Sequence, residues 1–181
     1  MSSNFSTREW ESRSELMKHL SRGGAEPNVI AVGVEAPRRF YSICVERQPA
    51  AWEVGVLLSY GVAPSLVFLQ QEERALLGHD SCVTWLDAKD GTQIVSHNFV
   101  GAFYEFIMVD KRDQAVVLHE IGASRVDANG SVLWSVAIDD IVGGWRVGPK
   151  GALVLSRWED GREVAVDLES GRVLSGEGRA F

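Results

Sequence analysis

The sequence predicts an all-β fold of antiparallel four-stranded meander repeats of about 40 residues, with one N-terminal helix. Two observations lead to this fold class. Short runs rich in valine, leucine, isoleucine and aromatic residues alternate with polar turn clusters, a spacing typical of all-β proteins. From residue 66 onward the same order of runs and turns returns, and an aspartate marks each return at Asp87, Asp127 and Asp167. A repeat of this length with four strands has the size of a propeller blade.

Residues 1–26 are predicted to hold the helix and a linker. The stretches Ser6 to Glu9 and Ser12 to Glu15 both read S-x-x-E, the pattern of a capping box, in which the two side chains satisfy free backbone amides. The helix would pack on the protein's own sheet, which we favour, or dock on a partner. Its apolar stripe would consist of Leu16, Met17, Leu20 and, as a fourth candidate, Trp10.

Residues 27–181 are predicted to form a single β-repeat domain. Its first part, 27–65, fills the place of one repeat but does not align with the others, and three clear copies follow it. The candidate strands of the divergent part are 29–35, 39–46 and 53–59. The three copies are 66–105, 106–144 and 145–181.

The aspartate of each copy opens a turn that a glycine closes. Such an aspartate accepts hydrogen bonds from nearby backbone amides, and the glycine supplies a positive φ. The stretch Val126-Asp127-Ala128-Asn129-Gly130-Ser131-Val132-Leu133-Trp134 resembles the blades of quinoprotein-like and WD40-like β-propellers, although Val95 and Ser175 replace the tryptophan in the other copies. The resemblance covers about residues 66–175 and implies an architecture only. With four repeats at most, either a small β-propeller-like ring or an open curved sheet fits.

Composition narrows the classes of partner. The 181 residues carry a formal charge of −7 and a pI of about 5.1, which disfavours nucleic-acid binding and suits either a basic protein partner or mere solubility. No apolar run reaches the length of a membrane span, and the first residues lack an apolar signal region, so we expect no membrane contact and a cytoplasmic location. Cys44 and Cys82 lie in apolar runs and are expected to be free thiols.

Two histidines beside carboxylates stand at equivalent repeat positions. His79-Asp80 and His119-Glu120 could be a metal site or an acid–base pair, and Glu159-Asp160 stands in the same place in the last copy. A repeat places equivalent residues on different blades, so a polar hairpin position is the favoured interpretation. No catalytic or cofactor-binding motif is present, and we expect no enzyme activity, no cofactor and no metal.

A hairpin tip near the C-terminus is the best candidate for a binding surface. Of the six tryptophans most are expected in the core, whereas Trp158, beside two acidic residues, is expected to be exposed. The candidate partner-binding residues are Trp158, Glu159, Asp160, Asp139, Asp140, His79 and His119.

These observations favour a non-catalytic protein-binding domain. The leading hypothesis is a bacterial immunity protein that neutralises a cognate toxin by binding its basic domain directly. The alternative is a regulatory or scaffold module with a β-propeller-like fold, and the third hypothesis is an enzyme with an unrecognised site.

Overall fold

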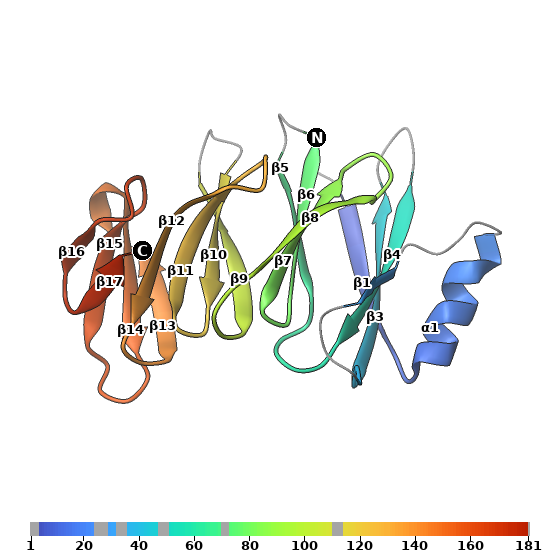
Figure 1. The fold of residues 1–181 in the computed structure, drawn as a ribbon, viewed down its shortest axis with the longest axis horizontal. Coiled ribbons are helices and arrows are strands. Elements are labelled where there is room, and N and C mark those ends of the chain that lie inside the picture. The colour runs from blue at the N-terminus through green and yellow to red at the C-terminus, as the bar shows by residue number, and fades with distance from the viewer. Residues whose placement is uncertain are drawn as a thin grey trace. The chain divides into compact units, whose positions relative to one another are not determined.

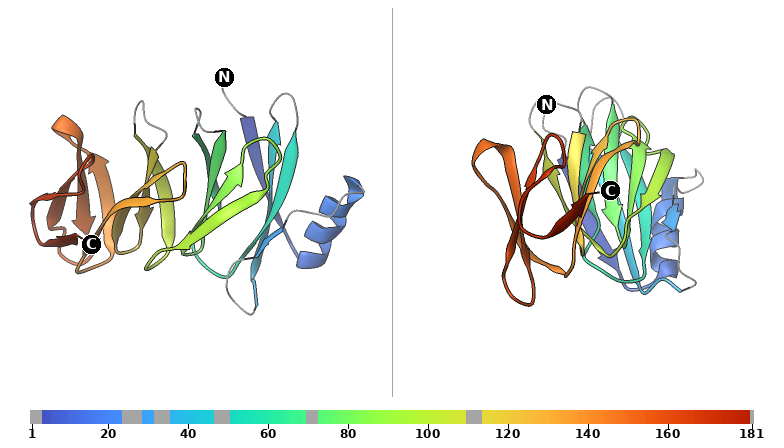
Figure 2. Two further views of the ribbon diagram at one scale, coloured as in Figure 1. Left: turned by 45° about the horizontal axis from the view of Figure 1, so that its top comes forward. Right: turned by 60° about the vertical axis from the view of Figure 1, so that its left-hand side comes forward.

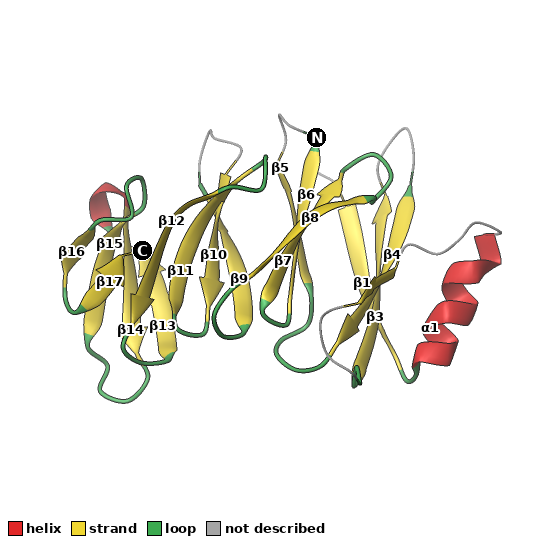
Figure 3. Ribbon diagram, viewed as in Figure 1, coloured by secondary structure: helices red, strands yellow, loops and turns green. Residues whose placement is uncertain are grey.

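The computed structural model describes residues 4–23, 29–31, 36–46, 51–69, 73–109 and 114–180, and these are mostly β-strand (Figures 1 and 3). The strands form four sheets. The chain divides into two compact units, Met1–Asn98 and Phe99–Phe181, and each unit holds two sheets around a hydrophobic cluster of its own. The predicted all-β fold class with one N-terminal α-helix is confirmed among the described residues.

The first sheet of unit 1 comes from the divergent part of the sequence. Its strands lie in the order β1-β3-β4-β2, with β2 parallel to β4 and the other pairs antiparallel. β3 has the predicted bounds and β4 lies within one residue of its prediction, whereas part of the predicted strand 29–35 falls outside the described residues. The bounds are β1 Asn4–Trp10, β2 Val29–Ala31, β3 Arg39–Glu46 and β4 Trp52–Leu58.

The prediction of a helix at the first S-x-x-E pattern was wrong. The residues around Ser6 form β1, which pairs along β3 from Asn4 opposite Glu46 to Trp10 opposite Phe40. This pairing occupies an edge of β3 that would otherwise be open, and that long-range gain outweighs a local capping signal.

The second S-x-x-E pattern does begin the helix. The Oγ of Ser12 accepts a hydrogen bond from the backbone N–H of Glu15 at 3.2 Å, and α1 runs from Arg13 to Leu20 before a short 3₁₀ turn, η1 (Ser21–Gly23). α1 packs against β4 and β3 with Leu16 fully buried (Figure 1). The helix therefore covers the protein's own sheet, as favoured from the sequence.

The second sheet of unit 1 is the meander that the repeat predicts. Its strands follow one another in space in chain order, each antiparallel to the next (Figure 1). Buried side chains of this sheet and of the first sheet form one core. The strands are β5 Ser65–Leu69, β6 Arg74–His79, β7 Cys82–Asp87 and β8 Gln93–Asn98.

Unit 2 consists of two such meanders, with one added strand. The third sheet is a meander of four strands, and the last strand of the chain, β17, returns to pair with β12 as a fifth (Figure 2). The fourth sheet is a four-stranded meander that includes the short 3₁₀ turn η2 (Pro149–Gly151) between its first two strands. The third sheet contains β9 Phe103–Met108, β10 Gln114–His119, β11 Gly122–Asp127, β12 Val132–Ile138 and β17 Gly178–Ala180. The fourth contains β13 Val142–Val147, β14 Ala152–Arg157, β15 Glu163–Asp167 and β16 Val173–Ser175.

The repeated aspartates cap turns, as predicted. In the third sheet the Asp127 carboxylate accepts hydrogen bonds from the backbone N–H groups of Asn129 at 2.9 Å and Ser131 at 2.8 Å. In the same way, the Asp87 carboxylate accepts from the backbone N–H of Lys89, and the Asp167 carboxylate accepts from that of Ser170. The glycines that close these turns have φ between 72° and 87°, a conformation that other residues adopt only with strain.

A tryptophan joins the two sheets of each unit. In unit 1 the indole N–H of Trp52 on β4 donates to the carbonyl of Ala88, inside the Asp87 turn, at 3.0 Å. In unit 2 the indole N–H of Trp134 on β12 donates to the carbonyl of Leu168, inside the Asp167 turn, at 3.2 Å. Within each unit, the first sheet is therefore fixed to the second by one indole hydrogen-bonded in a turn.

The closing glycine of each of these turns also makes room for the indole. A Cβ added at Gly171 would lie 2.5 Å from the Trp134 ring, and one at Gly91 would lie 2.6 Å from the Trp52 ring. These two glycines are therefore needed for two reasons: they adopt the positive φ of the turn, and they leave space for the indole of the adjoining sheet. Unit 2 adds the buried side chain of Arg125, whose Nη1 donates to the carbonyls of Leu168 and Glu169.

Candidate functional site: a loop rim in unit 2

Five connections gather at one end of unit 2, because antiparallel strands place alternate connections at the same end. We call this set the loop rim. The Asp-Gly turns of the same sheets lie at the opposite end of the strands. The loop rim consists of residues 99–102, 120–121, 139–141, 158–162 and 176–177.

Hydrogen bonds tie these connections to one another. The backbone N–H of Glu120 donates to the carbonyl of Ala102 at 2.7 Å, and the N–H of Ala102 returns a bond to the Glu120 carboxylate at 3.1 Å. The N–H of Val142 donates to the Glu120 carbonyl at 2.7 Å. The first three connections of the rim thus hold one another in place.

The β14–β15 hairpin is fixed to the rim in a related way. The backbone N–H of Trp158 donates to the carbonyl of Ile141 at 2.9 Å, and that of Glu159 donates to the Asp140 carboxylate at 3.0 Å. The bond from Glu159 lowers the pKa of Asp140, with smaller contributions from the Ile141 N–H and the nearby Arg157 guanidinium. Asp140 is therefore a structural acceptor as well as a rim charge.

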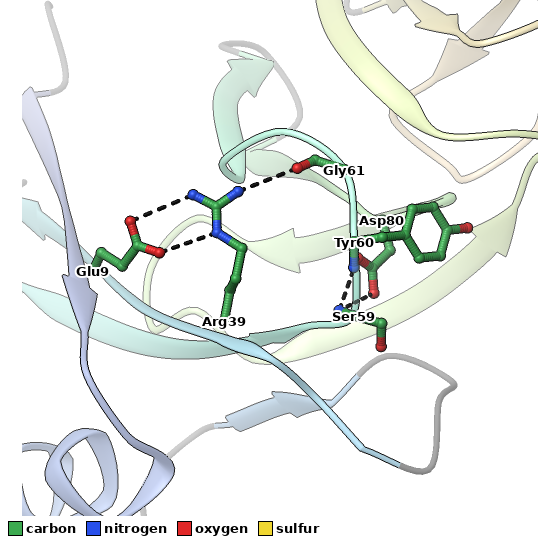
Figure 4. A network of polar contacts seen from close by, with 6 residues as sticks. All are labelled: Glu9, Arg39, Ser59, Tyr60, Gly61 and Asp80. Carbon is green, nitrogen blue, oxygen red and sulfur yellow. Dashed lines mark hydrogen bonds and ion pairs between the residues drawn. The ribbon is translucent and has the colours of Figure 1, made fainter.

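Unit 1 contains the same device (Figure 4). The buried carboxylate of Asp80 accepts from the backbone N–H groups of Ser59 and Tyr60 at 3.0–3.1 Å. On the other side of this connection Arg39, which is paired with Glu9, donates to the carbonyl of Gly61 at 3.2 Å. Fixing the connection to the following hairpin is thus a general feature of the repeat.

The structure corrects one equivalence drawn from the sequence. Strand register pairs Arg74 with Asp87 in the second sheet and Ala152 with Asp167 in the fourth. His79 lies five residues after Arg74, and Arg157 lies five residues after Ala152. The pair His79-Asp80 therefore corresponds to Arg157-Trp158 in the fourth sheet, and not to Glu159-Asp160. The β14–β15 hairpin contains five residues, 158–162, where the earlier hairpins contain two, and this extra length shifted the alignment.

The loop rim carries a strong charge imbalance. Its residues include six carboxylates and one arginine, Arg162, which gives a net charge of −5. Three apolar side chains lie exposed among these charges: Trp158 and Val100, each 71% exposed, and Ile141. The six carboxylates are those of Glu120, Asp139, Asp140, Glu159, Asp160 and Glu177.

A cavity of about 330 Å³ lies beside the Trp158 hairpin. The Arg157 guanidinium on its wall lies 3.6–3.7 Å from the carboxylates of Asp160 and Asp140, and Arg162 lies 3.3 Å from Asp160. The cavity is therefore bordered by guanidinium groups that already have carboxylate neighbours. Its lining consists of Arg157, Arg162, Glu163, Val164, Gly176 and Glu177.

The candidate histidines lie inside the sheets. His79 is 1% exposed, its Nε2 shares a hydrogen bond with the Thr84 hydroxyl at 2.9 Å, and Thr84 contacts the Ser96 hydroxyl at 2.8 Å. Burial lowers the pKa of His79 to about 4, so the imidazole is neutral at pH 7.

His119 repeats this arrangement one sheet later. Its Nε2 shares a hydrogen bond with the Ser124 hydroxyl at 3.2 Å, and Ser124 contacts the Ser135 hydroxyl at 2.7 Å. Burial lowers the pKa of His119 to about 4, and a hydrogen bond with the Val100 backbone opposes part of that shift. These hydroxyl-bonded imidazoles are core groups, and the described residues contain no group of three potential metal ligands.

The loop rim brings together five of the seven candidate residues, namely Asp139, Asp140, Trp158, Glu159 and Asp160. His119 is buried behind the rim, and His79 belongs to unit 1.

Sequence reasoning missed the exposed Val100 and Ile141 of the rim and the carboxylate of Glu177, and it considered Glu120 only as the neighbour of His119. The 40-residue repeat could have indicated Val100, since it stands at the position of Tyr60, another exposed side chain on a connection. The expected exposure of Trp158 is confirmed. Three of the six tryptophans are buried, and Trp10 and Trp145 are half-buried, with Trp145 packed against the core of unit 2.

The comparisons with known proteins agree on the fold. No protein-family model and no curated protein sequence matches the chain. Among solved structures it is similar to a dihydro-heme d1 dehydrogenase, NirN, with a TM-score of 0.56 and 15% identity over 76% of this chain and 34% of that one. The similarity to BamB from Moraxella catarrhalis has a TM-score of 0.51 and 12% identity and covers 97% of this chain and 51% of that one. The similarity to AztD from Citrobacter koseri has a TM-score of 0.51 and 13% identity and covers 82% of this chain and 45% of that one.

These neighbours have propeller-type folds, and the four-stranded antiparallel meanders of the chain are similar to the blades of such propellers. It spans between about a third and a half of the length of these three structures. The likeness concerns the fold alone. No helix in the described part of the chain has the length and apolar character needed to cross a membrane.

Proposed function

We propose that this chain is a non-catalytic protein-binding domain whose loop rim binds a basic protein. The observation that carries the proposal is the exposure of Val100, Ile141 and Trp158 within a surface of net charge −5. Protein interfaces combine a desolvated apolar centre with a polar border, and opposite charge on the partner speeds encounter and fixes orientation.

The fixed backbone of the rim supports this role. Ordering a loop on binding costs free energy, and this cost is smaller when hydrogen bonds already hold the loop. The bonds from Glu159 to Asp140 and between Ala102 and Glu120 hold four of the five rim connections before any partner arrives.

More specifically, we propose that the domain is a bacterial immunity protein that neutralises a cognate toxin by direct binding. An inhibitor of this kind needs one complementary surface and no reacting groups. The acidic chain, with a formal charge of −7, is suited to a basic toxin domain. The engagement of His79 and His119 with hydroxyl groups inside the sheets supports a non-catalytic role.

Charge reversal on the rim tests the proposal. The tagged protein is used to isolate its partner from the source cells, and the complex is checked for one-to-one stoichiometry. Changing Asp139 and Glu159 together to lysine is expected to weaken binding to the isolated partner at least a hundredfold, whereas Glu46→Lys, an exposed change in unit 1, leaves it within twofold. Equal affinity of the rim variant and the wild type would contradict the proposed surface.

Co-expression tests the finer proposal. If the partner is a toxin, the wild-type domain restores growth of cells that produce it, and the rim variant does not. A stoichiometric partner without toxicity would remove the immunity role and leave the binding role.

One observation favours a scaffold module as the second candidate. β8 forms an edge of the second sheet, whereas the comparable strand β12 is covered by β17. Open edges of this kind pair with strands of other molecules. Sedimentation of the isolated protein decides this point, since a concentration-dependent oligomer supports the scaffold and a monomer at all concentrations opposes it.

A further inference from the structure

We propose that Trp158 is the central contact of the interface and that the face of its indole ring binds an arginine side chain of the partner. This inference rests on the proposed function of the loop rim. It adds the residue that dominates the affinity and the chemistry that this residue recognises.

The first argument is the place of Trp158 in the repeat. Strand register puts Trp158 at the position of Asp80 in the second sheet and Glu120 in the third. Both of those carboxylates turn back and accept backbone N–H groups of the connection before them. An indole has one donor and no acceptor, so a tryptophan cannot make this bond.

The second argument is that another residue supplies the missing bond. In the fourth sheet the carboxylate comes from the connection, where Asp140 accepts the N–H of Glu159, in the direction opposite to the earlier sheets. The backbone bond from Trp158 to the Ile141 carbonyl is kept, like the bond from Glu120 to the Ala102 carbonyl. The hairpin therefore stays fixed while the side chain at 158 has no part in holding it.

The third argument is exposure. Trp158 is 71% exposed, whereas the carboxylate of Asp80 at the same repeat position is buried. The backbone behind Trp158 is packed closely, since a Cβ added at Gly143 would lie 2.9 Å from the Trp158 Cα. A large rigid side chain on a fixed backbone, surrounded by polar groups, has the properties of an interface hot spot.

The charges around the indole favour a cation. Glu159 and Asp160 follow Trp158 in the hairpin, and Asp139 is exposed on the adjoining connection. Arginines of this chain already lie beside three of the carboxylates: Arg157 beside Asp140, Arg162 beside Asp160 and Arg179 beside Asp139. The Arg179–Asp139 pair is a loose one, at 3.9 Å between exposed side chains, so Asp139 can exchange it for a partner's guanidinium. A guanidinium group stacks on an indole and pairs with carboxylates at the same time, so arginine fits this surface better than a neutral or acidic group.

A hexa-arginine peptide with a fluorescent label tests the inference directly. Its binding is measured by anisotropy at a fixed salt concentration near 0.15 M, with hexa-glutamate as the peptide control. Trp158→Ala is expected to weaken binding about tenfold and Trp158→Phe less, since a smaller ring keeps part of the cation–π attraction. Leu133→Ala removes an exposed apolar side chain outside the loop rim and is expected to leave binding unchanged.

Each outcome decides the question. If Trp158→Ala binds the peptide like the wild type while the double lysine variant at Asp139 and Glu159 does not, the assignment of Trp158 is overturned and the rim proposal stands. If the wild type does not bind the peptide, recognition of arginine is overturned, and charge reversal against the isolated partner still decides the proposed function. Thermal unfolding of Trp158→Ala at the wild-type temperature confirms that any loss of binding is local.

Discussion

The two ends of unit 2 use the same residue types for different purposes. At the turn end, Asp127 and Asp167 bond to their own backbone, and Gly171 receives the Trp134 indole. At the rim end, the rim residues include six carboxylates and one arginine, and Trp158 is exposed. Arg157 and Arg179, which lie outside the rim, approach Asp140 and Asp139. Within unit 2, the turn end joins the two sheets, and the proposed binding surface lies at the rim end, where Trp158 departs from the repeat.

The largest expected effect compares one glycine from each end. Gly171 and Gly161 have nearly the same positive φ, 72° and 68°, but only Gly171 meets the Trp134 ring, and nothing lies within 4 Å of a Cβ at Gly161. Gly161→Ala is expected to cost about 1 kcal/mol of unfolding free energy from backbone strain, and Gly171→Ala about 3 kcal/mol because the clash adds to it. Urea unfolding of both variants measures the difference, and equal losses would show that the indole does not need this space.

Lowering the pH tests the titratable groups that are buried inside the sheets. His79 and His119 bind a proton near pH 4 when folded but near 6.5 when unfolded, so the unfolded chain holds more protons between these values. Stability is therefore full above pH 6.5 and falls as the pH drops toward 4, by on the order of 1 kcal/mol per pH unit for each histidine. Urea unfolding at pH 7.0 and 5.5 measures this slope.

The control for the acid experiment is the double change of His79 and His119 to glutamine. Glutamine keeps hydrogen-bonding capacity without titrating, so the stability of this variant should vary less between the two pH values. An unchanged slope would show that other groups cause the loss.

A smaller effect should distinguish the two tryptophan joints, by which we mean the hydrogen bonds from the Trp52 and Trp134 indoles to a turn of the second sheet in each unit. The carbonyl of Leu168 receives both the Trp134 indole and Arg125, so Trp134→Phe leaves it with a donor. Trp52→Phe removes the indole bond to the Ala88 carbonyl, and the residue paired with Trp52 is Val45, where Arg125 is paired with Trp134. We expect a loss of about 2 kcal/mol for Trp52→Phe and about 1 kcal/mol for Trp134→Phe. Hydrogen exchange of the two turns reports each joint separately, and a greater loss in unit 2 would contradict the role of Arg125.

Much of the architecture could be predicted from the sequence. The 40-residue repeat, the aspartate caps and strand 39–46 depend on local patterns and turn chemistry, which a sequence displays directly. β1 was missed because its seven residues are strand only through pairing with β3, and the return of β17 to β12 is likewise a long-range pairing.

The candidate site was predicted in part. Exposure of Trp158 followed from its place between acidic residues at a hairpin tip, and the structure confirms it. In the third sheet the bonding carboxylate belongs to the hairpin residue Glu120, and in the fourth it belongs to the connection residue Asp140. This change could not be predicted from the sequence, because the longer β14–β15 hairpin displaced the alignment by two positions and the bond joins different connections.

One pair of variants tests the central claim most directly: Asp127→Ala from the turn end and Trp158→Ala from the rim, each measured for unfolding free energy and for affinity to the isolated partner. Asp127→Ala loses two turn hydrogen bonds and should lose about 1 kcal/mol of stability with unchanged affinity. Trp158→Ala should keep its stability and lose about tenfold in affinity. The reverse pattern, with binding lost at Asp127 and stability lost at Trp158, would contradict the division of unit 2 into a structural end and a binding end.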